Sequence, residues 1–491
     1  MINWDELHRY KENNRIEAKK ATGGLPHSIW ETYSAFANTA GGYILLGVEE
    51  QADKSLRAIT LAEPERLVTE FWNTVNNHQK VNVNILANRN VNIIETDGHR
   101  IVVIEVPRAD RRDKPVYIGA DPFAGSFRRN GEGDYHCSKD EVRNMMRDQS
   151  EVSQDLRVLE QLSLDAFDCE SVRRYRIRWQ SLKPNHVWEN LEDSDFLHKI
   201  GCIGRSESGK LHPTAAGVLM FGFEYEIVKE YPNYFLDYQE HDDETIRWTD
   251  RIISTSGEWS GNIFDFYYRV YNRITQIIKT PFKLQGDTRV DDTPVHKAMR
   301  EALTNALIHA NYYDRRGLVI HRRPGFVTIE NPGSLRISAT DAVSGGVSDP
   351  RNATLIKLFN LIEIGERSGS GLPSIFNVWE TQGWKAPLLE ERFNPDRTVL
   401  SLVLSQFNDR KVAINGSDNG KVAISYIQKQ KIIDYLTENG VCRASELSDL
   451  LGVTQARVRV LLSQLTVDGT VIANGANRNR TYRLKQSITH D

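Results

Sequence analysis

The sequence has few cysteines and no long apolar run. Its four cysteines lie far apart and form no CxxC pair: Cys137, Cys169, Cys202 and Cys442. This argues against a disulfide framework and a structural zinc site, and it favours a reducing compartment. The longest apolar stretches, such as residues 43–48, are far shorter than the roughly 20 residues of a membrane span, and the charged start is unlike a signal peptide. We therefore expect a cytoplasmic protein with no membrane partner.

The sequence also lacks an excess of positive charge. Its 62 Lys and Arg residues face 66 Asp and Glu residues, which gives a net charge of -4. Any nucleic-acid surface must therefore be a local patch. The 491 residues, 40% hydrophobic and 26% charged, have ordinary globular composition and predict about three domains. The fold class that we expect is multidomain α+β.

The first 148 residues predict an α+β domain. An amphipathic stretch over residues 25–38 runs into the glycine turn of residues 38–42 and then the apolar YILLGV of residues 43–48. Two β-rich runs, residues 91–96 and 101–106, flank the hairpin signal Asp97-Gly98.

Several charged side chains of this region are candidate site residues. Carboxylates that converge on Mg²⁺ or Mn²⁺, with a lysine nearby, support phosphodiester hydrolysis, and the candidates are Glu12, Glu17, Glu49, Glu50 and Lys19. The alternative is an ordinary ion pair, because Glu17 and Lys19 lie on one face of a strand. Arg128 and Arg129 are candidates for phosphate contacts, although charged loops often serve only solubility.

Residues 149–285 predict a connector, and residues 286–405 a second α/β domain. The amphipathic helix of residues 294–312 places Glu301, Asn305 and His309 on one face, opposite its apolar stripe. Glycine-bearing segments follow at residues 330–335 and 366–376, and glycine allows close backbone approach to phosphates. The order and spacing of these three features predict a nucleotide site, whereas a polar stripe alone is usually a solvated face.

The tail follows a polar linker over residues 406–427. Residues 428–486 predict three short helices and a hairpin, and residues 425–485 hold nine Lys and Arg against five Asp and Glu, a net +4. A helix in the major groove and a basic wing on phosphate need this distribution. The candidate DNA-binding residues are Gln455, Arg457 and Arg459 on the last helix and Arg478, Arg480 and Arg483 on the hairpin. The segment resembles the winged helix-turn-helix family, some of whose members make only protein contacts.

Four segments of the N-terminal region resemble the Schlafen AlbA-like domain over about residues 5–147. They are ENNRIEAKK, AFANTAGGYILLGV, KPVYIG and FRRNG. In nuclease members an acidic trio cuts RNA, and the matching positions are Glu12, Glu17 and Glu49 or Glu50. Many bacterial members are described as DNA-binding or transcriptional regulators. The resemblance therefore implies a nucleic-acid domain, catalytic or not.

Residues 286–404 resemble the GHKL ATPase fold, an α/β sandwich, in the divergent RecG-like version found beside Schlafen-like domains. The resemblance implies that Asn305 coordinates the Mg²⁺ of ATP and that Glu301 orients a hydrolytic water. Gly369, Ser370 and Gly371 would lie against the phosphates. Most members carry Asp-x-Gly-x-Gly in the adenine box, whereas this chain has Asn331-Pro332-Gly333-Ser334-Leu335. A degenerate fold that only dimerises is the alternative.

These features together predict an ATP-responsive, DNA-binding transcriptional regulator that forms homo-oligomers. RNA is a possible second partner. The rival hypotheses are a metal-dependent Schlafen-like nuclease in phage defence and a non-catalytic assembly protein.

Overall fold

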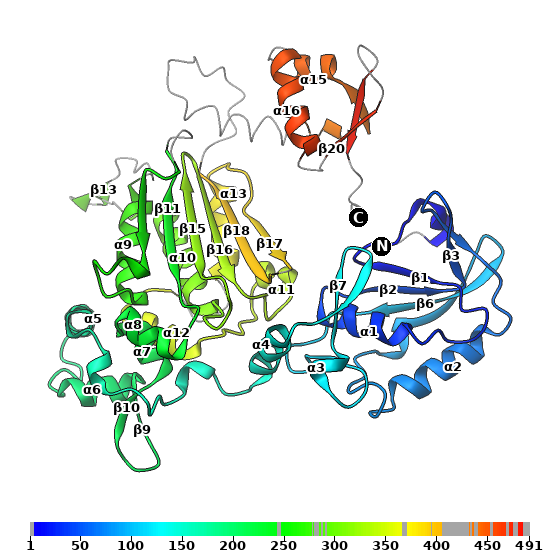
Figure 1. Cartoon of the computed structure of the whole chain (residues 1–491). Coiled ribbons are helices and arrows are strands. Elements are labelled where there is room, and N and C mark those ends of the chain that lie inside the picture. Colours follow the sequence, from blue (N-terminus) through cyan, green and yellow to red (C-terminus); the bar gives the residue numbers. More distant parts are fainter. Residues whose placement is uncertain are drawn as a thin grey trace.

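The computed structural model shows two large α+β domains and a small C-terminal one (Figure 1). It describes residues 4–242, 247–276, 278, 284–285, 288–289, 292–365, 371–393, 395–404, 432, 435–436, 440–451, 455–467, 471–474 and 480–484. Within these residues no helix is both long and apolar enough to cross a membrane. The expected multidomain α+β class is confirmed.

The N-terminal domain is built on a four-stranded sheet in the order β1 (Ile16–Lys19), β2 (Gly42–Leu46), β6 (His99–Val106), β5 (Val91–Thr96). Strand β1 pairs parallel with β2, and the other pairs are antiparallel. Side chains alternate across a strand, so Ile44 and Leu46 pack under α1 (Ile29–Asn38) and α2 (Pro64–Val75), while Leu45 enters a second core on the other face.

Shorter elements complete this domain. The second core lies under η1 (Trp4–Arg9) and the hairpin of β3 (Val48–Glu50) and β4 (Leu56–Ala58). The hairpin of β7 (Phe127–Asn130) and β8 (Gly133–His136) packs on α1 and is preceded by α3 (Pro122–Gly125). Helix α4 (Lys139–Gln149), which begins at a capping box of Ser138 and Glu141, then leads to the second domain.

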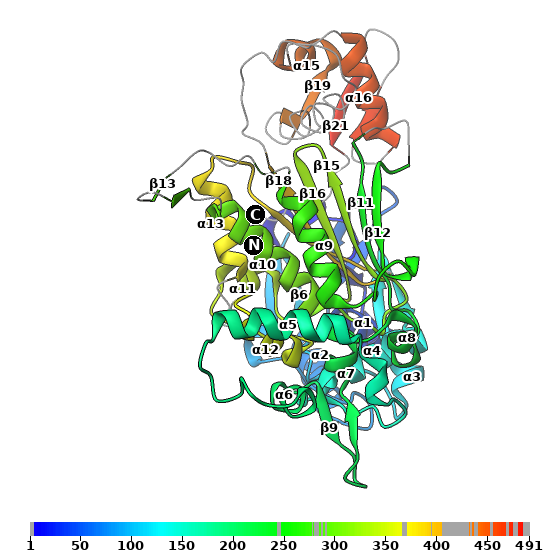
Figure 2. The ribbon, with the colours of Figure 1, turned by 90° about the vertical axis from the view of Figure 1, so that its left-hand side faces the viewer.

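A six-stranded sheet forms the second domain (Figures 1 and 2). Its order is β12 (Asp250–Ile253), β11 (Leu236–Glu240), β15 (Leu318–Arg323), β16 (Phe326–Pro332), β18 (Arg397–Val403), β17 (Leu388–Arg392). Only β11 and β15 pair parallel among these described strands. The helices α9 (Ile263–Thr275), α10 (Pro294–His309) and α13 (Gly371–Thr381) cover one face.

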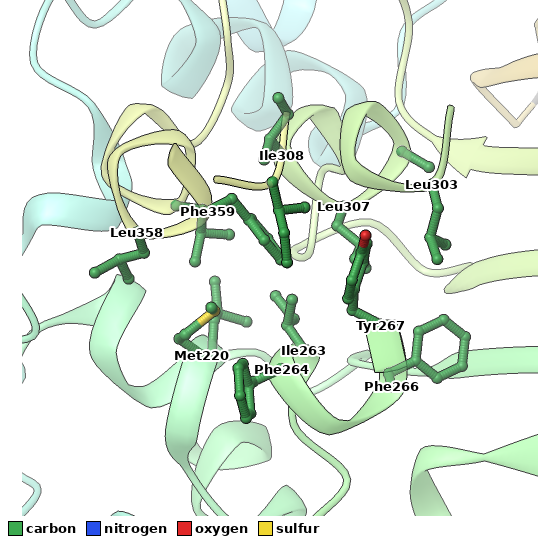
Figure 3. Close-up of a cluster of buried hydrophobic side chains, with 14 of the residues drawn as sticks. Met220, Ile263, Phe264, Phe266, Tyr267, Leu303, Leu307, Ile308, Leu358 and Phe359 are labelled. Atoms are coloured by element: carbon green, nitrogen blue, oxygen red, sulfur yellow. The ribbon is translucent and has the colours of Figure 1, made fainter. Parts of the chain in front are cut away.

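The expected boundary between a connector over 149–285 and a domain over 286–405 differs from the structure. Strands β11 and β12 and helix α9 come from the expected connector, yet they complete the same sheet and its covering layer. One continuous core contains buried residues from Leu159 to Leu402, and Figure 3 shows part of it, where Tyr267 of α9 lies near Leu307 of α10. Hydrophobic patterning does not reveal which strands pair, so a sheet assembled from distant segments escapes it.

The remaining elements of the expected connector pack against this core. They are α5 (Cys169–Leu182), α6 (Asp193–Ile200), the hairpin of β9 (Ile203–Arg205) and β10 (Leu211–Pro213), α7 (Ala215–Phe221) and α8 (Glu224–Glu230). Helices α11 (Ala339–Ser344) and α12 (Ala353–Leu361) follow β16. A short pair of strands, β13 (Leu284–Gln285) and β14 (Thr288–Arg289), lies between α9 and α10 in the chain.

The described part of the tail has its own core. Helices α15 (Ala444–Leu451) and α16 (Gln455–Val467) pack on a three-stranded sheet in the order β19 (Val441–Arg443), β21 (Thr481–Leu484), β20 (Val471–Asn474). The two helices and the antiparallel pair of β20 and β21 match the last two predicted helices and the predicted hairpin. The first predicted helix lies mostly outside the described residues. The expected linker at residues 406–427 lies outside the described residues.

Candidate functional site

A cavity of about 120 Å³ opens between α10, the strands β16 and β18 and the chain after β16. Helix α10 begins at a capping box of Thr293 and His296 with Pro294 at its first position, and its apolar stripe packs into the core. Glu301, Asn305 and His309 repeat every four residues, so all three line the cavity, as predicted. The side-chain amide of Asn305 donates to Glu301 Oε1 over 3.0 Å.

Gly371 closes the cavity at the start of α13. A Cβ atom at this position would collide with Glu301 Oε1 and lie 2.9 Å from Asn305 Nδ2. Only glycine allows the helix start to approach these two side chains so closely. The predicted phosphate residues Gly369 and Ser370 lie outside the described residues.

Asn331 and Thr398 form the floor of the cavity. They are directly paired across β16 and β18. Asn331 is buried, and within the described part of the chain its Oδ1 atom has no hydrogen-bond partner. A buried, unpaired acceptor is costly unless a ligand supplies a donor. Gly333, which follows in the turn, has a φ of 94° and approaches the Arg351 guanidinium.

The residues of this cavity fit a nucleotide with Mg²⁺. Asn331 offers an acceptor to the amino group of a base, and Gly371 brings the α13 backbone close to Asn305. Asn305 supplies an amide oxygen, a ligand type that Mg²⁺ accepts. His309 stays neutral, because burial lowers its pKa to about 4, helped by the charges of Arg351 and Arg336.

The predicted acidic residues of the N-terminal domain are brought together only in part. Burial raises the pKa of Glu12, and the negative charges of Glu17 and Glu50 raise it further. Glu12 Oε1 accepts a hydrogen bond from the Ala18 backbone over 3.0 Å. Glu49 points elsewhere, because adjacent strand residues face opposite sides, and it pairs with Lys20 at 3.0 Å.

Glu17 is held by two cations. Its Oε1 lies 3.0 Å from Lys19 Nζ and its Oε2 2.9 Å from Arg129 Nη2. Glu17 and Lys19 thus form the ion pair of the alternative interpretation, but the pair is largely buried and not on the surface as that interpretation expected. No group of three or more His, Cys, Asp or Glu side chains is arranged for a metal ion in the described part of the chain. The metal site at Glu12 and Glu17 stays a prediction.

Arg128 and Arg129 are not presented to solvent, contrary to the exposed phosphate contacts expected of them. The Arg129 side chain is 1% exposed, lies over the Phe36 ring and also pairs with Asp134 at 2.9 Å. Arg128 pairs with Glu141 and, at 2.8 Å, with Asp396 of the second domain. Their carboxylate partners already occupy the place of an anion, which the local sequence FRRNG does not reveal.

The candidate DNA-binding residues of the tail are partly described. Gln455 and Arg459 are exposed on α16 and Arg480 is exposed before β21, where it lies over the Tyr482 ring. Arg483 is half-buried on β21. The Arg457 side chain and Arg478 lie outside what the structure describes.

The sequence gives no signal for a set of ion pairs between the two large domains. Asp148 at the end of α4 lies 2.8 Å from both Arg336 and Arg351, and Arg108 binds Glu391. The partners are separated by about 190 to 280 residues in the chain, so no local pattern links them.

Three family models match this chain. Residues 12–138 match the family described as Schlafen, AlbA_2. Residues 320–400 match the one described as "Putative ATP-dependent DNA helicase recG C-terminal". The chain therefore combines a region similar to Schlafen AlbA_2 domains with a region similar to the RecG C-terminal family. Between them, residues 143–237 match a domain of unknown function, DUF8451, which covers the first part of the expected connector, up to residue 237.

No curated protein matches the chain significantly. Among solved structures, the crystal structure of the DIP2311 protein from Corynebacterium diphtheriae is 15% identical, with a TM-score of 0.39, over 96% of this chain and 95% of that one. The solution structure described as the "N-terminal Domain of Putative ATP-dependent DNA Helicase RecG-related Protein" from Nitrosomonas europaea is 31% identical, with a TM-score of 0.22, over 27% of this chain and 90% of that one.

Proposed function

We propose that this protein is a nucleotide-responsive, DNA-binding regulator. The observation that carries the proposal is the cavity of the second domain, where Glu301, Asn305 and Gly371 meet beside the unpaired acceptor of Asn331. The matches to a Schlafen AlbA_2 region and a RecG C-terminal region support a nucleic-acid role combined with nucleotide binding.

ATP is the nucleotide that the cavity suits. The exocyclic amino group of adenine is the donor that Asn331 Oδ1 needs, and this pairing does not require the carboxylate of the usual adenine box. Asn305 would contribute to the Mg²⁺ site, and Glu301, within hydrogen-bond distance of Asn305, would orient water. We expect binding with slow hydrolysis or none.

DNA binding rests on the C-terminal domain. The net +4 of residues 425–485 and the exposed Arg459 and Arg480 provide the phosphate attraction that a winged helix requires. Nucleotide bound in the second domain would shift the balance between arrangements of the nucleic-acid domains that differ in affinity for it. A homodimer would present two such tails.

The nucleotide part is tested by thermal unfolding with Mg-ATP. A ligand that binds only the folded state raises its stability with occupancy, so the chain should show a rise at millimolar Mg-ATP that Asn305→Ala abolishes. Glu301→Gln should keep the rise while lowering any hydrolysis. Asn360→Ala, on α12 and absent from the cavity lining, is the matched control. No rise with the unmodified chain would favour the assembly protein with a degenerate fold.

A metal-dependent nuclease is the second candidate, favoured by one observation. Glu12, Glu17 and Glu50 are close enough for their charges to raise the pKa of Glu12, which is how carboxylates behave where they share a site for a cation. Mg²⁺ or Mn²⁺ would have to compete with Arg129 and Lys19 for Glu17.

Labelled DNA and RNA incubated with Mg²⁺ or Mn²⁺ distinguish the two candidates. The nuclease predicts cleavage that Glu12→Ala and Glu17→Ala each nearly abolish, with a double variant hardly worse, because ligands of one ion act together. Glu49→Ala, whose carboxylate pairs with Lys20, should keep the activity. The regulator predicts retention of DNA without cleavage.

A further inference from the structure

A cationic face of the N-terminal domain is covered by the second domain. Arg108, Arg111, Lys114 and Arg128 line one cavity of about 60 Å³ at the junction of the two domains. Figure 1 shows the place, where β7 and α4 lie between the sheet of the N-terminal domain and the second domain. We call these four side chains the covered face.

Carboxylates of the second domain occupy the covered face. Arg108 binds Glu391, with Nη2 and Oε1 3.1 Å apart, and Arg111 binds Asp349. Arg128 Nη2 lies 2.8 Å from Asp396 Oδ1. Each carboxylate meets a guanidinium in the way that a phosphate oxygen would.

The balance of charge depends on these three carboxylates. The N-terminal domain itself lines the cavity with four cations and two acids, Glu141 and Asp148, a net +2. The second domain adds four acids, Asp314, Asp349, Glu391 and Asp396, and two cations, Arg336 and Arg351, so the total falls to zero. With the second domain docked the face has no net charge to attract phosphates, and without it the net +2 attracts them.

The segments of the second domain that contact the covered face also line the nucleotide cavity. Ser334, Leu335, Arg336, Asp349 and Arg351 all line that cavity. The Leu335 backbone donates to Glu391 Oε1 over 2.8 Å, and its carbonyl accepts from Arg108 Nη2 over 2.7 Å.

Two arginines of these segments also contact the N-terminal domain. Arg336 and Arg351 each bind Asp148 at 2.8 Å, and Arg351 also donates to the carbonyls of His309 and Ser334. A nucleotide that shifts residues 334–336 or 349–351 must therefore shift the contacts between the domains, because hydrogen bonds weaken steeply as their geometry changes.

We propose that the covered face is a second binding surface for the phosphate backbone of a nucleic acid, shielded in this state by Asp349, Glu391 and Asp396. Nucleotide in the second domain and nucleic acid on this face are then linked, so each changes the affinity of the other by the same factor. The nucleotide link rests on the proposed function, whereas the shielding rests only on the ion pairs.

The test is a triple variant of the full chain, Asp349→Asn, Glu391→Gln and Asp396→Asn. Fluorescence anisotropy measures its affinity for labelled duplex DNA and for single-stranded RNA at fixed salt, with and without Mg-ATP. We expect affinity for one of them to rise about tenfold or more, with a steeper salt dependence, because more phosphates are engaged. The effect of Mg-ATP on binding should shrink.

A matched control removes the same number of carboxylates elsewhere. Glu170→Gln, Asp193→Asn and Glu207→Gln are exposed and lie on α5, α6 and the β9–β10 hairpin, on the side away from the N-terminal domain in Figure 1. If the triple variant binds both nucleic acids no more tightly than this control, the proposal is overturned. Adding Arg108→Gln and Arg111→Gln to the triple variant should remove the gain, and a gain that persists also overturns it.

Failure of the proposed function gives a different result. If the unmodified chain shows no response to Mg-ATP but the triple variant still gains affinity, the shielded surface stands and only the nucleotide link is lost. Hydrogen exchange of residues 108–114 and 388–392 should speed up in the triple variant, and unchanged exchange with unchanged affinity refutes the shielding.

Discussion

We expect that replacing Arg129 with methionine strongly lowers the free energy of unfolding of the N-terminal domain. The guanidinium is 1% exposed, binds Glu17 and Asp134 at 2.9 Å each, and donates to the Asn13 carbonyl over 2.8 Å. Methionine keeps most of the apolar stem but leaves two largely buried carboxylates without this cation. Breaking a buried ion pair from one side costs about 3–5 kcal/mol.

The magnitude is measurable by hydrogen exchange in the full chain. The backbone amides of β2 and β6 exchange through opening of the N-terminal domain, so their protection reports its free energy of unfolding. We expect protection to fall by about 3 kcal/mol or more, roughly a factor of 100. Arg100→Met is the control, because its ion pair with Glu65 is exposed to solvent and contributes little to stability.

A double-mutant cycle separates charge from packing. Glu17→Gln in the Arg129→Met background removes one uncompensated carboxylate, so it should recover part of the lost stability. Arg129→Met that lowers protection by less than about 1 kcal/mol would refute the reasoning. So would a double variant that is less stable than both single variants.

Three further predictions concern the second domain and the tail. Gly371→Ala should abolish the Mg-ATP thermal shift and cost about 1–3 kcal/mol, because its Cβ would strike Glu301, whereas Gly23→Ala, with no described atom within 4 Å of the added Cβ, should do neither. The free energy of unfolding of the second domain should fall by at most about 3 kcal/mol as the pH drops from about 6.5 to about 4, because His309 is protonated at a higher pH in the unfolded chain than in the folded one. Urea titrations at several pH values measure this slope, which His309→Gln should flatten. Arg480→Glu with Arg483→Glu should weaken binding to all DNA sequences and reduce the salt slope, and an unchanged slope would exclude the wing from the interface.

The site residues that the sequence predicted well lie close together in the sequence, on one secondary-structure element. Glu301, Asn305 and His309 lie on a single helix whose period follows from its apolar stripe, so their common face could be predicted. The hairpin at Asp97-Gly98 was likewise a local feature and is confirmed, and the strand expected over residues 43–48 is found as Gly42–Leu46, ending before Gly47, which has a φ of 84°.

The misplaced residues depend on contacts between distant segments. Arg129 meets Glu17 across 112 residues, and Arg128 meets Asp396 across 268. No local pattern distinguishes a buried arginine with such partners from one in a solvated loop. The place of β11 and β12 in the second sheet was missed for the same reason, since β11 pairs with the distant β15 and β12 is joined to the sheet through β11.

The continuous core from Leu159 to Leu402 also affects how this architecture can be divided or inherited. Cutting the chain near residue 285 would strip β11 from β15, leave a row of backbone groups unpaired and expose the apolar face beneath α9. A fragment starting there would be expected to aggregate. The segment matching the domain of unknown function, residues 143–237, ends inside β11, and the RecG C-terminal match begins only at residue 320, so an exchange that moved the latter region alone would produce an incomplete sheet. We expect these two regions to occur together in related proteins, because neither forms the complete sheet alone.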